Sequence, residues 1–267
     1  MNCRQDVSSS GPQEKITVFQ SSISLGDPHI CSDSITRLSM IFSVYDALVE
    51  RDIAGRYQPA LAESWTVEED ARTWTFQLRN GVKFHNGEIL DAEDVTASLG
   101  RVLDPAIGGA FGTQGVYSSY LGNAEITAPG NSTVRIVTAE PMADLLDLLV
   151  AMPISPAGEL ALLPDEYVGS GPYKIAEKEA DRTLLEAFDG YWGKPPEYSR
   201  ILWIAEPSAE KRMEALLSGE ADIIYGIEPE GRERIKSSGT AILKEQQSGL
   251  CIIFMLNSQE GPCRDRR

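Results

Sequence analysis

Apolar and polar residues alternate along several short stretches, as they do in strands with one buried face. In TWTFQL, at 73–78, three large apolar residues alternate with polar ones. Asn80-Gly81 then predicts a tight turn, and Val82 and Phe84 predict a second strand. Further strands are predicted from apolar runs bounded by turn-forming residues, at 15–24, 132–138, 168–175, 199–206, 221–227 and 249–257.

Helical spacing of apolar residues appears in other segments. Asp91 is a predicted N-cap, and Pro105 marks the stop of the helix that follows it. Ser208 is a second predicted N-cap, with Gly219 closing that helix. Helices are expected at 34–48, 92–104, 143–150 and 209–218. The Gly-, Ser- and aromatic-rich segment 106–123 has no clear period and is predicted to be a loop.

The 267 residues carry a formal net charge of −16, which excludes the basic footprint that nucleic acid requires. No apolar run approaches the roughly 20 residues of a membrane-spanning helix. Residues 1–14 are polar and are predicted to be a disordered tether without the apolar core of a signal peptide. Within it, Cys3 is a candidate site of lipid attachment or an incidental thiol, and both interpretations stay open.

The sequence motifs that mark known catalytic sites have only weak matches in this chain. Ser208-Ala209-Glu210-Lys211 matches S-x-x-K, but a helix N-cap explains the serine better. The two histidines, His29 and His85, have no metal-site or triad spacing around them. Carboxylates are abundant, so an acidic hydrolase stays open as an alternative of another class. No catalytic residue, metal ligand or cofactor is predicted.

The stretch TWTFQLRNGVKFHNGEILDAEDVTASLGRVLDP resembles the signature of the family 5 extracellular solute-binding proteins, the peptide and nickel receptors of bacterial ABC importers. The residues that fit it are Trp74, Leu78, Arg79, Gly81, Val82, Lys83, Phe84, His85, Gly87, Ala92, Asp94, Val95 and Arg101. Three other blocks resemble family segments in the same order, at 44–65, 168–175 and 188–227. In the first of them Asp46 stands where Glu is commoner.

The resemblance implies a mixed α/β (α+β) fold, a periplasmic-binding-protein-like lobe with an inserted α+β subdomain. The lobe core would comprise 15–41 and 165–267, and the insert would span 42–164. Family members close two lobes around a ligand. The second lobe is expected to be absent from this chain, so we expect a fragment that folds and binds ligand weakly.

The resemblance also implies where a solute would lie. Ligand contacts are expected from the loop after the first strand, from the aromatic loop of the insert and from the ends of two late strands. The candidate ligand-binding residues are Ser21, Ser22, Ile23, Phe111, Tyr117, Tyr120, Tyr225 and Asn257. For each tyrosine, simple packing is an equal alternative.

The implied function is solute capture without catalysis. The expected ligand is a dipeptide or oligopeptide, with a nickel chelate, an opine or an oligosaccharide as alternatives. The stretch 151–158 has no arginine, which argues against the nickel chelate. The implied partners are an ABC permease and its ATPase, with a chemosensor as another possible recipient. The protein is expected to be a monomer outside the cytoplasm, in the periplasm or anchored by lipid at the outer face of the membrane.

Overall fold

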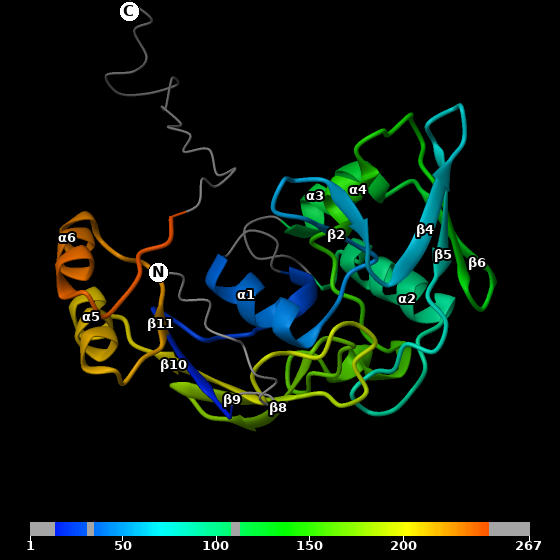
Figure 1. Ribbon diagram of the computed structural model, residues 1–267. Helices are drawn as coiled ribbons and strands as arrows, with labels where there is room; N and C mark the ends of the chain where they lie inside the picture. Colours follow the sequence, from blue (N-terminus) through cyan, green and yellow to red (C-terminus); the bar gives the residue numbers. More distant parts are fainter. Residues whose placement is uncertain (1–13, 31–34, 108–112, 246–267) are drawn as a thin grey trace, which may run out of the picture. The chain divides into compact units, whose positions relative to one another are not determined.

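The computed structural model describes residues 14–30, 35–107 and 113–245 (Figure 1). Contacts divide the chain into one unit over Met1–Glu228 and another over Pro229–Arg267. The first unit holds every strand in the described part of the chain. In the second unit the described structure is a single helix, α6, at Pro229–Ser238. This helix was not predicted.

A five-stranded mixed sheet has the strand order β11-β1-β10-β9-β8. β1 runs parallel to both of its neighbours, whereas β9 runs antiparallel to β10 and β8. The strands are β1 Ile16–Gln20, β8 Tyr173–Lys178, β9 Arg182–Ala187, β10 Arg200–Ala205 and β11 Ile223–Ile224. All but β9 were predicted, and the mixed character of the fold is confirmed.

A second sheet, of four antiparallel strands in the order β4-β5-β7-β6, lies in the middle of the chain (Figure 1). Its strands are β4 Ala62–Val67, β5 Thr73–Leu78, β6 Glu125–Gly130 and β7 Thr133–Val137. β5 buries Trp74, Phe76 and Leu78, as the alternation predicted. Two short strands form a separate hairpin, β2 Val49–Arg51 with β3 Tyr57–Pro59.

The predicted strand at Val82 and Phe84 is wrong. Gly81 and Gly87 both take positive φ, so the chain turns twice within a few residues. Between these turns only an isolated bridge forms, from Lys83 to Ile89. Val82 and Phe84 are nevertheless fully buried, so their apolar side chains anchor the turns to the core.

Helices cover the sheets in the first unit. They are α1 Ile35–Val44, α2 Ala92–Leu103, α3 Thr113–Leu121, α4 Leu145–Leu149 and α5 Ala209–Ser218, with the 3-10 turns η1 Pro28–Ile30 and η3 Ala157–Leu162. The predicted loop at 106–123 is wrong where α3 forms. The helix predicted at 34–48 ends at Val44 and is therefore shorter than expected.

Both predicted N-caps are confirmed. The Asp91 carboxylate accepts hydrogen bonds from the backbone N–H of Glu93 and Asp94, and the Asp94 carboxylate accepts one from the Asp91 N–H. This reciprocal capping box fixes the start of α2. The Ser208 hydroxyl accepts from the Lys211 N–H, and Gly219 ends α5 with φ of 82°.

The five-stranded sheet is covered on both faces because successive residues of β1 point in opposite directions. Val18 packs with Met40 of α1 and with Tyr45, which follows that helix. Phe19 packs on the other face with Ala215 of α5. The largest apolar cluster lies around the four-stranded sheet and α2. The division into a discontinuous core and an insert at 42–164 stays a prediction.

Candidate functional site

The carboxyl ends of β1, β10 and β11 lie at one edge of the five-stranded sheet, because these three strands are parallel (Figure 1). Open sheets with parallel strands bind ligands outside such an edge. The backbone ties the three ends together, since the Glu206 N–H donates to the Gln20 carbonyl and the Tyr225 N–H to the Phe19 carbonyl. This edge is the candidate site.

Three of the predicted ligand residues meet at this edge. Ser21 and Ser22 follow β1 and are exposed, so their hydroxyls are available to a ligand. Tyr225 follows β11 and is 43% exposed. Its ring stacks on Trp203, with centroids 6.5 Å apart and planes 16° apart. The buried Trp203 thereby orients a half-exposed aromatic face beside two hydroxyls, an arrangement suited to backbone amides and flat groups.

Arg212 holds the two loops that carry this edge. Its guanidinium donates to the carbonyls of Glu206 and Pro207 after β10, and to those of Tyr225 and Gly226 after β11, at 2.7–3.0 Å. The residue is 5% exposed. A planar guanidinium can bind several carbonyls at once, which fixes the loops relative to each other.

Sequence reasoning missed both Arg212 and Trp203. Arg212 lies next to the buried Met213 in α5, and this position in the helix is the signal that could have identified it as a buried arginine. Trp203 lies inside a predicted strand, where a tryptophan is expected to pack in the core and gives no sign of a binding role.

The other predicted ligand residues do not join this edge. Ile23 is buried in the cluster between α1 and the sheet. Tyr117 is buried beside α2, and its hydroxyl donates to the Leu148 carbonyl. Tyr120 is exposed on the same helix, α3, which packs on α2. Phe111 and Asn257 lie outside the described residues, as does Cys3.

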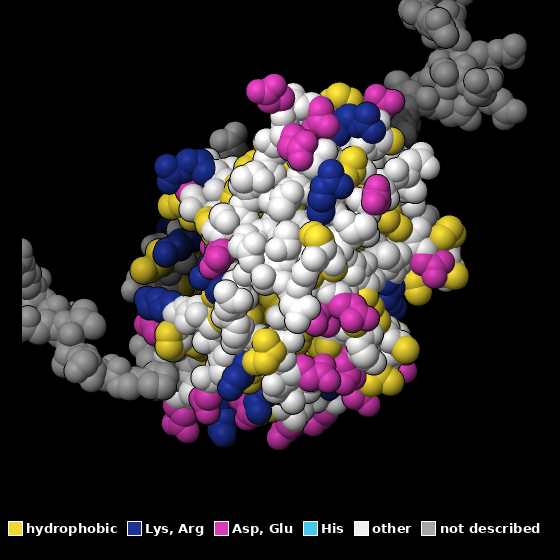
Figure 2. Space-filling view, turned by 90° about the vertical axis from the view of Figure 1, so that its right-hand side faces the viewer, with side chains coloured by type: hydrophobic (Ala, Val, Ile, Leu, Met, Phe, Trp, Pro, Cys, Tyr) yellow, Lys and Arg dark blue, Asp and Glu magenta, His cyan; other side chains and the backbone are white. Residues whose placement is uncertain are grey.

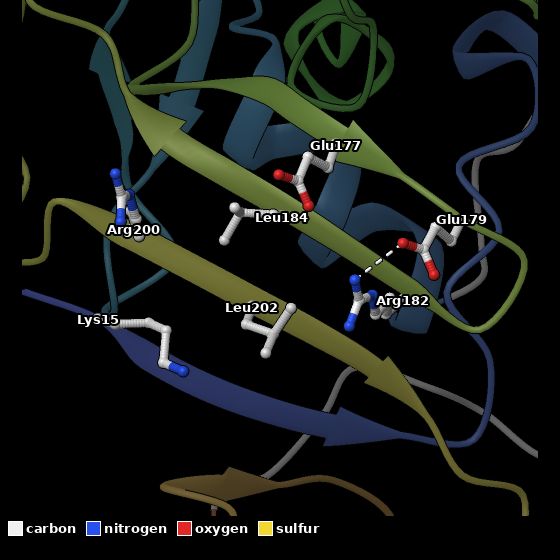
Figure 3. Close-up of a pocket in the computed structure, with 7 residues that line it drawn as sticks. All are labelled: Lys15, Glu177, Glu179, Arg182, Leu184, Arg200 and Leu202. Atoms are coloured by element: carbon white, nitrogen blue, oxygen red, sulfur yellow. Dashed lines mark hydrogen bonds and ion pairs between the residues drawn. The ribbon is translucent and has the colours of Figure 1, made fainter.

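A shallow depression of about 190 Å³ lies on the sheet face away from α1 (Figure 3). Leu184 and Leu202 form its floor, with an ion pair between Arg182 and Glu179 at one side. Its remaining lining residues are Lys15, Glu177 and Arg200. Long charged side chains surround the two leucines, so its shape depends on rotamers that solvent leaves free. We do not place the solute there.

Both histidines have structural roles. His85 accepts from the Gly169 N–H through Nδ1 and donates to the Gly171 carbonyl through Nε2. His29 is bound in the same way by Arg101 and the Pro153 carbonyl. Burial lowers the pKa of each imidazole to about 4, so both are neutral near pH 7. Both ring nitrogens of each histidine are therefore hydrogen-bonded within the protein, and none is left to act on a substrate.

Two carboxyls, those of Asp46 and Asp94, have raised pKa values because of burial, but they do not form a pair with each other. The pKa of Asp46 is raised to about 6, and that of Asp94 is raised as well. The two carboxylate oxygens of Asp94 accept hydrogen bonds from the backbone N–H groups of Asp91 and Ala157. Neither carboxyl is among the charges that shift the other. Asp46 and Asp94 therefore do not form the pair of carboxyl groups that an acidic hydrolase requires.

The surface is mixed in charge. On the face in Figure 2, acidic side chains lie among basic and apolar ones, without a continuous basic patch among the residues drawn in colour. No helix in the described part of the chain is long and apolar enough to cross a membrane. Residues 14–30, 35–107 and 113–245 contain no group of three or more His, Cys, Asp or Glu that could hold a metal ion.

Comparisons with known proteins agree with this architecture. The family described as bacterial extracellular solute-binding proteins, family 5 Middle, matches residues 56–267. The chain is 28% identical over 265 residues to the dipeptide-binding protein of Escherichia coli K12, covering 90% of this chain and 49% of that protein. It is 32% identical over 213 residues to the glutathione-binding protein GsiB of Shigella boydii, covering 75% and 40%.

A solved structure is similar over a comparable share. The binding protein AgaA from A. tumefaciens R10, in complex with agropinic acid, superposes with a TM-score of 0.76 at 28% identity. The superposition covers 84% of this chain and 46% of AgaA. The chain thus spans less than half the length of each of these relatives.

Proposed function

Because the chain belongs to the bacterial extracellular solute-binding proteins of family 5, we propose that it serves in the substrate-binding component of an ABC importer. It would capture a peptide-like solute outside the cytoplasm for transport across the membrane. The observation that carries this proposal is the edge where Ser21, Ser22 and Tyr225 meet at the carboxyl ends of parallel strands.

A peptide suits this edge chemically. Hydroxyls such as those of Ser21 and Ser22 donate to and accept from backbone amides, whatever the peptide's sequence. The half-exposed ring of Tyr225 offers an apolar surface for a side chain or a peptide plane. Two relatives are named for dipeptide and glutathione binding, and both ligands are short peptides.

An opine is the second candidate solute. AgaA, in complex with agropinic acid, is as similar in identity to this chain as the dipeptide-binding protein is. An opine of this kind would also use the hydroxyls and the aromatic face of the same edge.

The proposed partners are an ABC permease and its ATPase, to which the captured solute would be passed. Attachment to the membrane would depend on Cys3 carrying a lipid. Neither partner contact nor lipid attachment is needed for solute capture itself, so the binding step is tested separately.

Thermal melting with a panel of solutes tests the proposal. The 267-residue chain and a longer version that reaches the length of the relatives are melted with dipeptides, glutathione, agropinic acid, nickel with histidine, and an oligosaccharide. A solute that binds only the native state raises the melting temperature. The proposal expects a peptide or agropinic acid to stabilise the longer version. A shift with none of these solutes, or hydrolysis of a solute, would overturn it.

A further inference from the structure

A groove of about 400 Å³ lies at the junction of α1, the β2–β3 hairpin and the start of β8. Most of its wall comes from the segment that follows α1. The lining residues are Phe42, Tyr45, Asp46, Ala47, Val49, Glu50, Arg51, Ala60, Val150, Pro172 and Tyr191. This set is called the Asp46 groove below.

The Asp46 groove is separate from the strand edge proposed for the solute. Pro172 precedes β8, whose first residue, Tyr173, pairs with Ala187 at the end of β9. Ala187 lies beside the start of β10, because its N–H donates to the Ser199 carbonyl. The groove therefore adjoins the amino end of β10, whereas Tyr225 lies at the opposite edge of the sheet.

The Asp46 carboxylate is enclosed by neutral donors. Its Oδ2 accepts hydrogen bonds from the Trp192 Nε1–H at 2.8 Å and from the Ser170 hydroxyl at 3.1 Å. The nearby Tyr191 hydroxyl also favours the ionised form of Asp46 and acts to lower its pKa. No Lys, Arg or His in the described part of the chain forms a salt bridge with it. The side chain still keeps a partly exposed surface, so a ligand in the groove could reach it.

The charge of the groove is negative and uncompensated. Arg51 is the cation in its wall, and its guanidinium is bound by the Asp147 carboxylate and the Tyr57 hydroxyl. Glu50 adds a second carboxylate at the exposed side, close enough to act on Asp46. Burial raises the pKa of Asp46 to about 6, so keeping the ion in this place has a free-energy cost that a bound cation would offset.

The shape and the apolar wall favour an organic cation over a metal ion. Phe42 and Tyr191 bring two partly exposed aromatic side chains to the wall, and the fully buried Tyr45 lies behind it. Aromatic faces attract ammonium groups, and a volume of several hundred Å³ suits a small molecule. The two carboxylates fall short of the three or more ligands that a protein metal site provides.

We propose that the Asp46 groove binds a small organic ammonium ion, with the Asp46 carboxylate as its counter-ion and Glu50 at the mouth. The ring of Tyr191 covers the apolar part of the ligand. Binding here is distinct from solute capture at the strand edge. Arg51 contributes no repulsion because Asp147 neutralises it.

Calorimetric titration with benzylammonium, and with benzyl alcohol as a neutral molecule of the same shape, tests the proposal. Wild type is expected to bind benzylammonium at least about tenfold more tightly than the alcohol, since one ion pair of this kind is worth a factor of ten or more. Asp46→Asn, which keeps an acceptor oxygen for Trp192, should remove this preference. Glu50→Gln should reduce it, and the exposed Glu125→Gln should leave it unchanged.

The wild-type protein gives a readout that needs no variant. Lowering the pH from about 7.5 to about 5 should weaken benzylammonium binding about tenfold, because Asp46 becomes protonated. Tyr45, Glu50, Arg51 and Tyr191 are the other ionisable residues that line the groove. Equal binding of alcohol and ammonium, no binding of benzylammonium, or an unchanged affinity in folded Asp46→Asn would each overturn the proposal.

Discussion

Arg101 and Asp27 form a doubly hydrogen-bonded ion pair, with Nη1–Oδ1 at 2.9 Å and Nη2–Oδ2 at 2.5 Å. The two side chains are only 11% and 10% exposed. The pair joins the last turn of α2 to the segment between β1 and α1, residues far apart in sequence. Arg101 also donates to the Nδ1 of His29, so one guanidinium orders a carboxylate and an imidazole together.

Removing one member of this pair should be strongly destabilising. Arg101→Leu leaves Asp27 as a buried charge without its partner, and we expect a loss of about 3 kcal/mol in the free energy of unfolding. Urea denaturation measures it. The control Arg182→Gln breaks the exposed pair with Glu179 and should cost about 0.5 kcal/mol or less. Equal losses in the two variants would contradict the structural role of the Arg101–Asp27 pair.

Stability should fall as the pH drops below neutrality. The folded pKa of His85 is about 4, below its ordinary value of 6.5, so between these values the unfolded chain binds a proton that the native protein does not. One such histidine should cost roughly 2 kcal/mol between pH 7 and pH 5. His29 acts in the same direction. Asp46 acts in the opposite direction, because its folded pKa of about 6 lies above 3.8.

Denaturation of His85→Asn at the two pH values isolates this contribution. The variant should be less stable than wild type near pH 7, because Gly169 and Gly171 lose a hydrogen-bond partner. It should also lose less stability than wild type on acidification. Parallel losses in both proteins would show that His85 does not titrate in the way proposed.

Gly171 is required by a close approach of two backbones. A Cβ added there would lie 2.6 Å from the Val44 carbonyl carbon, while the Gly171 N–H donates to the Val44 oxygen at 2.9 Å. Gly171→Ala should therefore destabilise the protein by about 3 kcal/mol in thermal or urea unfolding. Gly158→Ala, with nothing within 4 Å of the added Cβ, is the matched control and should change stability by less than about 1 kcal/mol. A mild effect at Gly171 would mean that the chain there can move apart.

The capping box of α2 should contribute measurably to the free energy of unfolding. Asp91→Ala removes the acceptor for the backbone N–H groups of Glu93 and Asp94, and we expect a loss of about 1 kcal/mol in urea unfolding. Asp91→Ser retains an acceptor and should recover most of that loss. If serine and alanine behave alike, the side-chain cap is not what stabilises this end of the helix.

The parts of the fold that sequence predicted are those with a strong local pattern. β5 has strict alternation, and α2 and α5 have caps at their starts. α3 was missed because, among its side chains at 115–121, only those of Tyr117 and Leu121 are buried, one turn apart, amid Gly and Ser. β9 was missed because its pairing with β8 and β10, rather than a local sequence pattern, stabilises it as a strand.

The candidate site was predictable only where it follows the ends of strands. The family resemblance implied Ser21, Ser22 and Tyr225 as ligand contacts, and these three residues follow the ends of β1 and β11. The contribution of Arg212 depends on four carbonyls from two loops, which meet only in the folded chain. The Asp46 groove likewise combines residues from distant segments. In the sequence, Asp46 stands out only as an aspartate at a position where glutamate is commoner in the family pattern.

The central claim is that a solute binds at the carboxyl ends of β1, β10 and β11. Calorimetric titration of the longer version with a dipeptide, glutathione and agropinic acid tests it most directly, with Tyr225→Ala beside Tyr120→Ala. Both tyrosines are exposed, but only Tyr225 lies at this edge. We predict that Tyr225→Ala weakens binding of the preferred solute about tenfold and that Tyr120→Ala leaves it unchanged. Unchanged affinity in Tyr225→Ala, or a loss confined to Tyr120→Ala, would contradict the claim.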